Sequence, residues 1–146
     1  MRRTTLVCAI LIALLANISF LPIGYVERLW QLRGVPYSRL TCSAFIDQAH
    51  DKTFIKQCGS LRIWQGRCPN QTRIAEFASL DELDHSILKP GDILAFHGDH
   101  VAAYAGEGTF LDSDPSHANQ GVGVMQPNGG NAAWFRGRVR VIRWTQ

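Results

Sequence analysis

The segment Leu88–Pro115, LKPGDILAFHGDHVAAYAGEGTFLDSDP, decides the fold class that we expect for this chain of 146 residues. KPGD and HGD contain the glycine and proline typical of turns, and they flank ILAF, a short apolar run with the length of a strand. HVAAYA and TFLDSD are two further strand-like runs, joined by the loop GEG. The segment therefore predicts an antiparallel meander of three strands.

The length of the GEG loop decides which side chains face one another across the predicted hairpin. With a three-residue loop whose last glycine is left-handed, the expected pairs are Ala105–Thr109, Ala102–Asp112 and His100–Asp114. Because side chains alternate along a strand, His100 and Asp112 then share one face as diagonal neighbours, about 7–8 Å apart at the backbone. A two-residue loop would turn both aspartates to the other face.

The segment Ser38–His50, SRLTCSAFIDQAH, follows the turn RGVPY and has the period of a helix. Its apolar residues at i, i+3, i+4 and i+7 are Cys42, Phe45, Ile46 and Ala49. With Thr41 as the N-cap, Cys42 lies in the first turn, where unpaired N–H groups and the helix dipole favour a thiolate and can hold an oxyanion. A cysteine on an apolar helix face is more often a core residue, so the helix alone leaves both interpretations open.

The composition indicates a single packed domain. Hydrophobic residues make up 46% of the chain and charged residues 18%, which argues against disorder. The formal net charge is only +3 and no nucleic-acid-binding motif is present, so we expect no nucleic-acid partner.

Residues 1–25 have the pattern of a signal peptide or an N-terminal membrane anchor. Two arginines, Arg2 and Arg3, precede the uninterrupted apolar run Leu6–Ala16. A good cleavage site is missing, and the apolar stretch is long enough to span a bilayer, so cleavage and anchoring both stay open. In either case we expect export of a domain spanning residues 26–146 to the periplasm, cell envelope or medium, with membrane association possible through this segment.

Export gives the cysteines an oxidising environment. Cys58 and Cys68 lie ten positions apart, and whether they form a disulfide stays open at this stage. If they pair, Cys42 is the unpaired thiol of the exported domain. Neither this spacing nor His97 and His100, which have no third ligand, predicts a metal site.

The segments GVPYSRLTCSAFID and LKPGDILAFHGDHVAAYAGEGTFLDSDP together resemble the NlpC/P60 family of cysteine peptidases, papain-like hydrolases that cut stem peptides of bacterial cell walls. TCSAF stands where the family usually has DCSGF, and PGD, HVxxYxG and GxF match in order. The resemblance covers about Gly34 to Asp114, with a looser extension to WFRGRVRVIRW. It implies an α+β, papain-like fold with N-terminal helices packed on a central antiparallel sheet.

The resemblance also implies roles for five residues. Cys42 matches the nucleophile, His100 the base, and Asp112 the third residue that orients the imidazole. Tyr37 matches a tyrosine near the oxyanion, and Ser43 the residue after the nucleophile, which helps to hold the substrate. The implied protein is a monomer that needs no metal or organic cofactor and hydrolyses peptidoglycan stem peptides, at the bond between D-glutamate and the diamino acid.

Three departures keep other functions open. Thr41 replaces an aspartate that often binds a substrate amino group, Asp112 stands where histidine is more common, and Tyr37 is unusually close to Cys42 in sequence. The alternatives are a non-catalytic peptidoglycan-binding module with a degenerate site, and a papain-like amidase or effector that acts on another amide.

The C-terminal segment permits two interpretations. Its arginines, which either attract substrate carboxylates or lie on a solvated edge strand, are Arg136, Arg138, Arg140 and Arg143. Trp134 and Phe135 belong either to a groove wall or to the core.

Overall fold

The computed structural model describes residues 24–50, 58–118 and 120–144. The predicted signal or anchor lies outside this part of the chain except for its last two residues, and Tyr25 begins the first described helix. None of the helices in the described ranges has the length and apolar character needed to cross a bilayer.

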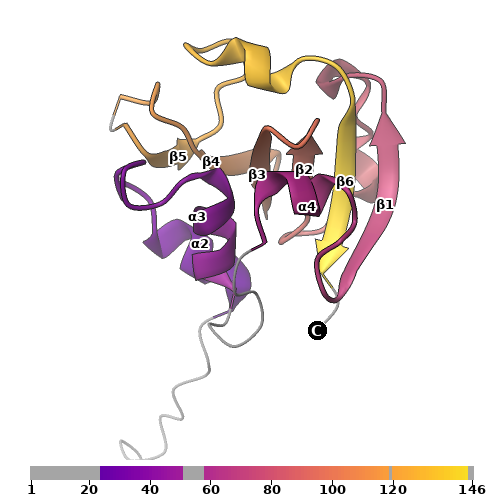
Figure 1. Cartoon of the computed structure of the whole chain (residues 1–146), viewed down its shortest axis with the longest axis horizontal. Helices are drawn as coiled ribbons and strands as arrows, with labels where there is room; N and C mark the ends of the chain where they lie inside the picture. Colours follow the sequence, from indigo (N-terminus) through magenta and orange to yellow (C-terminus); the bar gives the residue numbers. More distant parts are fainter. Residues whose placement is uncertain (1–23, 51–57, 119, 145–146) are drawn as a thin grey trace, which may run out of the picture.

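Six antiparallel strands form one sheet in the order β1-β6-β2-β3-β4-β5 (Figure 1). The strands are β1 Gln71–Phe77, β2 Ile93–Phe96, β3 His100–Gly106, β4 Thr109–Ser113, β5 Val122–Val124 and β6 Val139–Trp144. The predicted meander is confirmed as β2–β3–β4. Because β2 lies between two other strands and both of its faces are covered, all four of its residues are buried, which explains the continuous apolar run ILAF.

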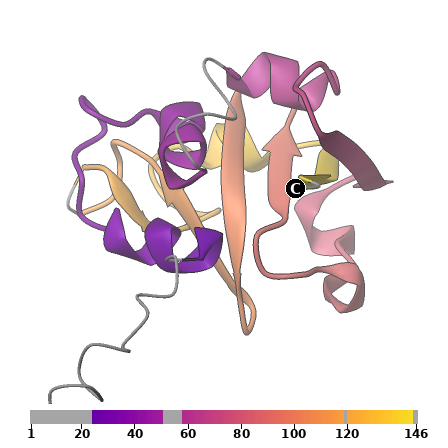
Figure 2. The same cartoon turned by 90° about the horizontal axis from the view of Figure 1, so that it is seen from below.

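Within the described residues, three helices and three short 3-10 turns accompany the sheet. The helices are α2 Tyr25–Gln31, α3 Cys42–Ala49 and α4 Ser60–Trp64, and the turns are η1 Leu80–Glu82, η2 His85–Ile87 and η3 Ala132–Phe135. Helices α2 and α3 pack on each other and on β3, and α4 packs on β2 (Figure 2). The protein is therefore a mixed helix and strand fold built on one antiparallel sheet.

Strand alternation divides the core into two apolar clusters. Phe45 and Ile46 of α3 pack with Val101 of β3 in one cluster, whereas Ala102 and Tyr104 belong to the other, which also contains Phe135. Helix α3 is held by its predicted apolar face, since Phe45, Ile46 and Ala49 are fully buried. Burial of each large side chain contributes about 1.5–3 kcal/mol, and this burial fixes the start of α3 beside β3.

The β3–β4 hairpin reaches the expected face by a different route. Ala102 pairs with Asp112 as predicted, but Gly106 rather than Ala105 pairs with Thr109. The loop therefore has two residues, both with the positive φ that a tight hairpin turn needs. A bulge at Ala105 adds the residue that the shorter loop lacks, so Asp112 stays on the His100 face.

The C-terminal strand is not at an edge of the sheet, so that expectation is wrong. Strand β6 lies between β1 and β2, because the distant segment Gln71–Phe77 pairs along it. Arg140 forms an ion pair with Glu76 of β1, and Arg143 forms one with Asp92. These two arginines therefore have partners within the protein.

Candidate active site

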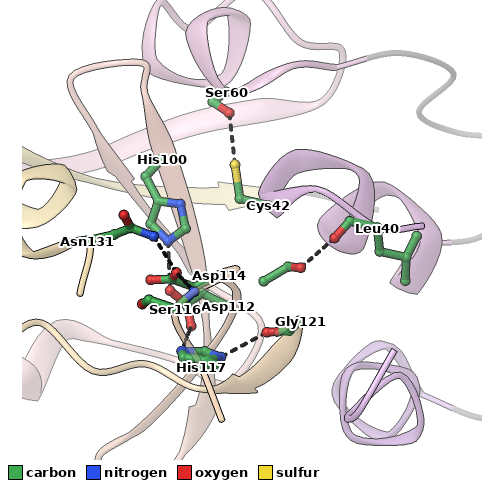
Figure 3. Close-up of polar contacts among 11 residues, drawn as sticks. Leu40, Cys42, Ser60, His100, Asp112, Asp114, Ser116, His117, Gly121 and Asn131 are labelled. Carbon is green, nitrogen blue, oxygen red and sulfur yellow. Dashed lines mark hydrogen bonds and ion pairs between the residues drawn. The ribbon is translucent and has the colours of Figure 1, made fainter. Parts of the chain in front are cut away.

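Cys42 is the first residue of α3 and is only 5% exposed. Thr41 is the N-cap, as predicted, but its side chain makes no capping hydrogen bond. The hydroxyl group therefore leaves the first N–H groups of the helix to other acceptors. The chain just before the helix is tied to β4, because Ser113 donates a hydrogen bond to the carbonyl oxygen of Leu40 (Figure 3).

His100 and Asp112 form a fully buried pair. His100 Nε2 lies 2.7 Å from Asp112 Oδ2, and neither side chain is exposed to solvent. Since Nε2 is engaged by the carboxylate, Nδ1 is the ring nitrogen left for the Cys42 thiol. It is buried without a hydrogen-bond partner in the described structure, and His100 and Cys42 each shift the pKa of the other. The structure thus brings together Cys42, His100 and Asp112. Asp114, the other aspartate that the hairpin offered, follows the end of β4 and binds Ser116 and Asn131 instead.

The electrostatics of this trio favour charge separation. Burial disfavours the charged form of Cys42, but hydrogen bonding and the charge of His100, together with Ser60, lower the pKa of the thiol below its usual value of 9.0. Burial likewise opposes protonation of His100, yet Asp112 and Cys42 outweigh it and raise the pKa of the ring to about 9. Both shifts act in the direction of a thiolate beside an imidazolium.

Ser60 is a site residue that the sequence analysis missed. Its hydroxyl oxygen lies 3.3 Å from the Cys42 sulfur, and it begins α4 (Figure 3). Cys58, two positions earlier, forms a disulfide with Cys68, which closes the loop that contains α4. The CGS sequence resembles many surface turns, so only knowledge of the disulfide could have drawn attention to this serine.

Aromatic side chains surround the imidazole. Trp134 of η3 stacks on the His100 ring with centroids 4.7 Å apart, and Phe135 meets it edge-on at 5.2 Å. Phe135 belongs to the core, and the half-buried Trp134 packs against the same cluster, so core packing is the interpretation that the structure supports for both residues. Stacking restricts the rotation of His100 and limits the access of water to it.

The two predicted substrate-binding residues border the site. Tyr37 is half-buried, and its ring centroid lies 6.5 Å from that of Trp134. Burial, followed by the negative charges of Cys42 and Asp114, raises the pKa of Tyr37, which places its hydroxyl group in the field of the site. Ser43 follows Cys42 in the first turn of α3 and is half-buried.

A polar cluster lies behind Asp112. His117 belongs to the polar segment between β4 and β5, yet it is only 5% exposed. The ligand-type atoms of Asp112, Asp114 and His117 lie within 4.8 Å of one another. Each side chain already has a protein partner, since Asp112 binds His100, Asp114 accepts from Asn131, and His117 binds a backbone carbonyl. The three residues are therefore a cluster of buried side chains, each of which is hydrogen-bonded within the protein.

No protein-family model, curated protein or solved structure matches this chain. The motifs of the chain and the geometry of its site are therefore what indicates a function.

Proposed function

We propose that this protein is an NlpC/P60-like cysteine peptidase that hydrolyses amide bonds in peptidoglycan stem peptides. The observation that carries the proposal is the Cys42–His100–Asp112 arrangement, with the thiol at a helix N-terminus and His100 hydrogen-bonded at 2.7 Å to a buried carboxylate. A core cysteine does not need a buried aspartate–histidine pair beside it, because burying these ionisable groups has a large desolvation cost. Clusters of perturbed ionisable groups of this kind are typical of functional sites.

The chemistry would proceed by nucleophilic catalysis. The Cys42 thiolate attacks the amide carbonyl carbon, and N–H groups at the start of α3 stabilise the oxyanion. Protonated His100 then donates its proton to the leaving amine, which gives a thioester and neutral His100. His100 next removes a proton from water, which hydrolyses the thioester and restores the thiol. Asp112 stabilises the imidazolium and holds the ring nitrogen that faces Cys42 in place.

The order of the elements supports a papain-like fold. A helix that carries the nucleophile precedes an antiparallel sheet that carries the base and the third residue on consecutive strands. The resemblance of the motifs to those of the NlpC/P60 family adds the substrate class, peptidoglycan stem peptides. Thr41 is exposed at the position where the family has a substrate-binding aspartate, so we expect the enzyme to place less weight on a free amino group of the substrate.

The test is digestion of purified muropeptides by the purified full-length chain, with products identified by mass spectrometry. The matched control is Cys42→Ala, which removes the sulfur from a site that is otherwise retained. Cleavage that disappears in the variant supports the proposal, and the product masses identify the bond. If neither protein cleaves but both bind intact sacculi, the chain is a binding module. If neither cleaves nor binds, the proposed substrate is wrong.

A further inference from the structure

The two carboxylate oxygens of Asp112 face two different histidines. Oδ2 lies 2.7 Å from Nε2 of His100, and Oδ1 lies 3.2 Å from Nε2 of His117 (Figure 3). His117 is only 5% exposed, and Asp112 is completely buried. Within the described part of the chain, neither Asp112 Oδ1 nor His117 Nε2 makes a hydrogen bond, and the two buried atoms form an ion-pair contact with each other.

Backbone hydrogen bonds in the turn after β4 hold His117 at this position. The chain turns back after β4, with the N–H of His117 bonded to the Asp114 carbonyl at 3.3 Å and the N–H of Gln120 bonded to the His117 carbonyl at 2.7 Å. Asp112 pairs across the sheet with Gly123 of β5. A Cβ atom on Gly123 would lie 2.8 Å from His117 Nδ1, so the absence of a side chain there makes room for the ring.

Hydrogen-bond chemistry assigns the protons on this ring. His117 Nδ1 lies 2.8 Å from the carbonyl oxygen of Gly121, which is an acceptor only, so Nδ1 carries a hydrogen. Nε2 faces a carboxylate oxygen, and two lone pairs would repel each other there, so Nε2 must carry a hydrogen as well. The carboxylates that face His117 are those of Asp112, 3.2 Å from Nε2, and Asp114, whose own pKa the charge of His117 helps to lower.

We propose that His117 is a positioning residue, an imidazolium that anchors the second oxygen of Asp112 so that the first stays on His100. With one histidine nitrogen at each oxygen, the carboxylate is held from rotating away from the His100 ring. His100 is thereby held with its other nitrogen toward Cys42. This inference rests on the proposed function, since it concerns the orientation of the proposed catalytic base.

The first test uses the wild-type protein and needs no substrate. Nitrogen-15 NMR of the histidine rings near neutral pH should find both nitrogens of His117 protonated. A His117 ring with an unprotonated Nε2 under these conditions would overturn the proposal.

The second test compares two substitutions of His117, each of which keeps one of the two polar contacts of the ring. His117→Asn retains a donor near Gly121 but is too short to reach Asp112, whereas His117→Gln reaches Asp112 and gives up the Gly121 contact. The measurement is the rate of Cys42 alkylation by iodoacetamide at a pH where wild-type Cys42 is only partly ionised. We expect about a tenfold lower rate for His117→Asn, equivalent to one pKa unit of lost thiolate, and a rate within about threefold of wild type for His117→Gln.

The possible outcomes separate the two hypotheses. The reverse order of the two variants, or no change in either, would mean that His117 only holds the loop, and would refute its positioning role. A wild-type thiol that reacts like an ordinary free cysteine would instead refute the Cys42–His100 pair and, with it, the proposed function. If circular dichroism shows that a variant does not fold, the ring-nitrogen measurement on the wild type decides.

Discussion

Two groups of charged residues in this molecule differ in the environment in which they pair. At the boundary of β3, β4 and β5, Asp112 lies between His100 and His117, and all three are buried. Near β1 and β6, Glu76 forms ion pairs with Arg138, whose side chain is 66% exposed, and with Arg140, whose side chain is 20% exposed. Surface pairs contribute at most about 1 kcal/mol each, whereas buried charges carry a large desolvation cost.

Burial alone does not mark a functional group in this protein. Asp92 is also buried, and it makes a two-pronged interaction with Arg143, with both N···O distances 2.7 Å. That pair joins the start of β2 to β6 and contacts no thiol in the described structure. The buried cluster around Asp112 differs because it holds a cysteine with a lowered pKa and a histidine with a raised one.

The largest effect should come from replacing one buried aspartate and not the other. Asp112→Asn removes the charge that supports protonated His100, and we expect amide hydrolysis to fall by about a thousandfold or more. Asp92→Asn is the matched control and should leave the rate per folded molecule unchanged while lowering the free energy of unfolding by about 1–3 kcal/mol. Steady-state kinetics and urea denaturation measure the two quantities. Equal losses of activity in both variants would remove the distinction between the pairs.

The next effect concerns the opposite side of the site, where a covalent bond supports Ser60. Replacing both disulfide cysteines, Cys58→Ser with Cys68→Ser, should lower the free energy of unfolding by about 2–3 kcal/mol, because a loop of ten residues is no longer closed in the unfolded chain. The same variant should slow Cys42 alkylation, since Ser60 is held less firmly beside the sulfur. Unchanged stability in urea would show that the disulfide does not support this side of the site.

The pH dependence of the hydrolysis rate should report on the buried cluster that contains His100. The thiolate–imidazolium form exists above the lowered pKa of Cys42 and below the pKa of His100, which is about 9. The hydrolysis rate should therefore decline by about tenfold per pH unit above this value, as His100 loses the proton that the leaving amine needs. A rate that keeps rising above pH 9 would mean that free thiolate alone is sufficient, and that His100 does not act as an acid.

The smallest effect should follow from changing the surface cluster. Glu76→Gln removes the common partner of Arg138 and Arg140, but Arg138 is exposed to water and Arg140 keeps its hydrogen bond to the Trp64 carbonyl oxygen. We expect the melting temperature and the rate of hydrolysis to stay close to those of the wild type. A large loss of activity would show that this surface belongs to the site.

Local patterns in the sequence predict helix α3 and the β2–β3–β4 meander, because helical period, strand alternation and turn residues act over a few positions. The loop of the hairpin was predicted one residue too long, and the bulge at Ala105 could not be foreseen from alternation alone. The pairing of β1 with β6 joins segments more than 60 residues apart, and no local pattern specifies it.

The candidate site shows the same division. The meander and the resemblance single out His100 and Asp112, and a helix start singles out Cys42. Ser60 and His117 reach the site through a disulfide and through the space above Gly123, and both of these depend on the folded chain. Residues that contact the site residues only through the tertiary fold are therefore the ones that sequence patterns fail to identify.

The pH profile of Cys42 alkylation by iodoacetamide tests the central claim most directly, with His100→Gln as the comparison. The account predicts a wild-type profile with its midpoint below that of an ordinary thiol, and a shift of the midpoint to higher pH in the variant, because the imidazolium partner is gone. Identical profiles for the two proteins, both at the pH of an ordinary or buried thiol, would contradict it and make Cys42 a core residue.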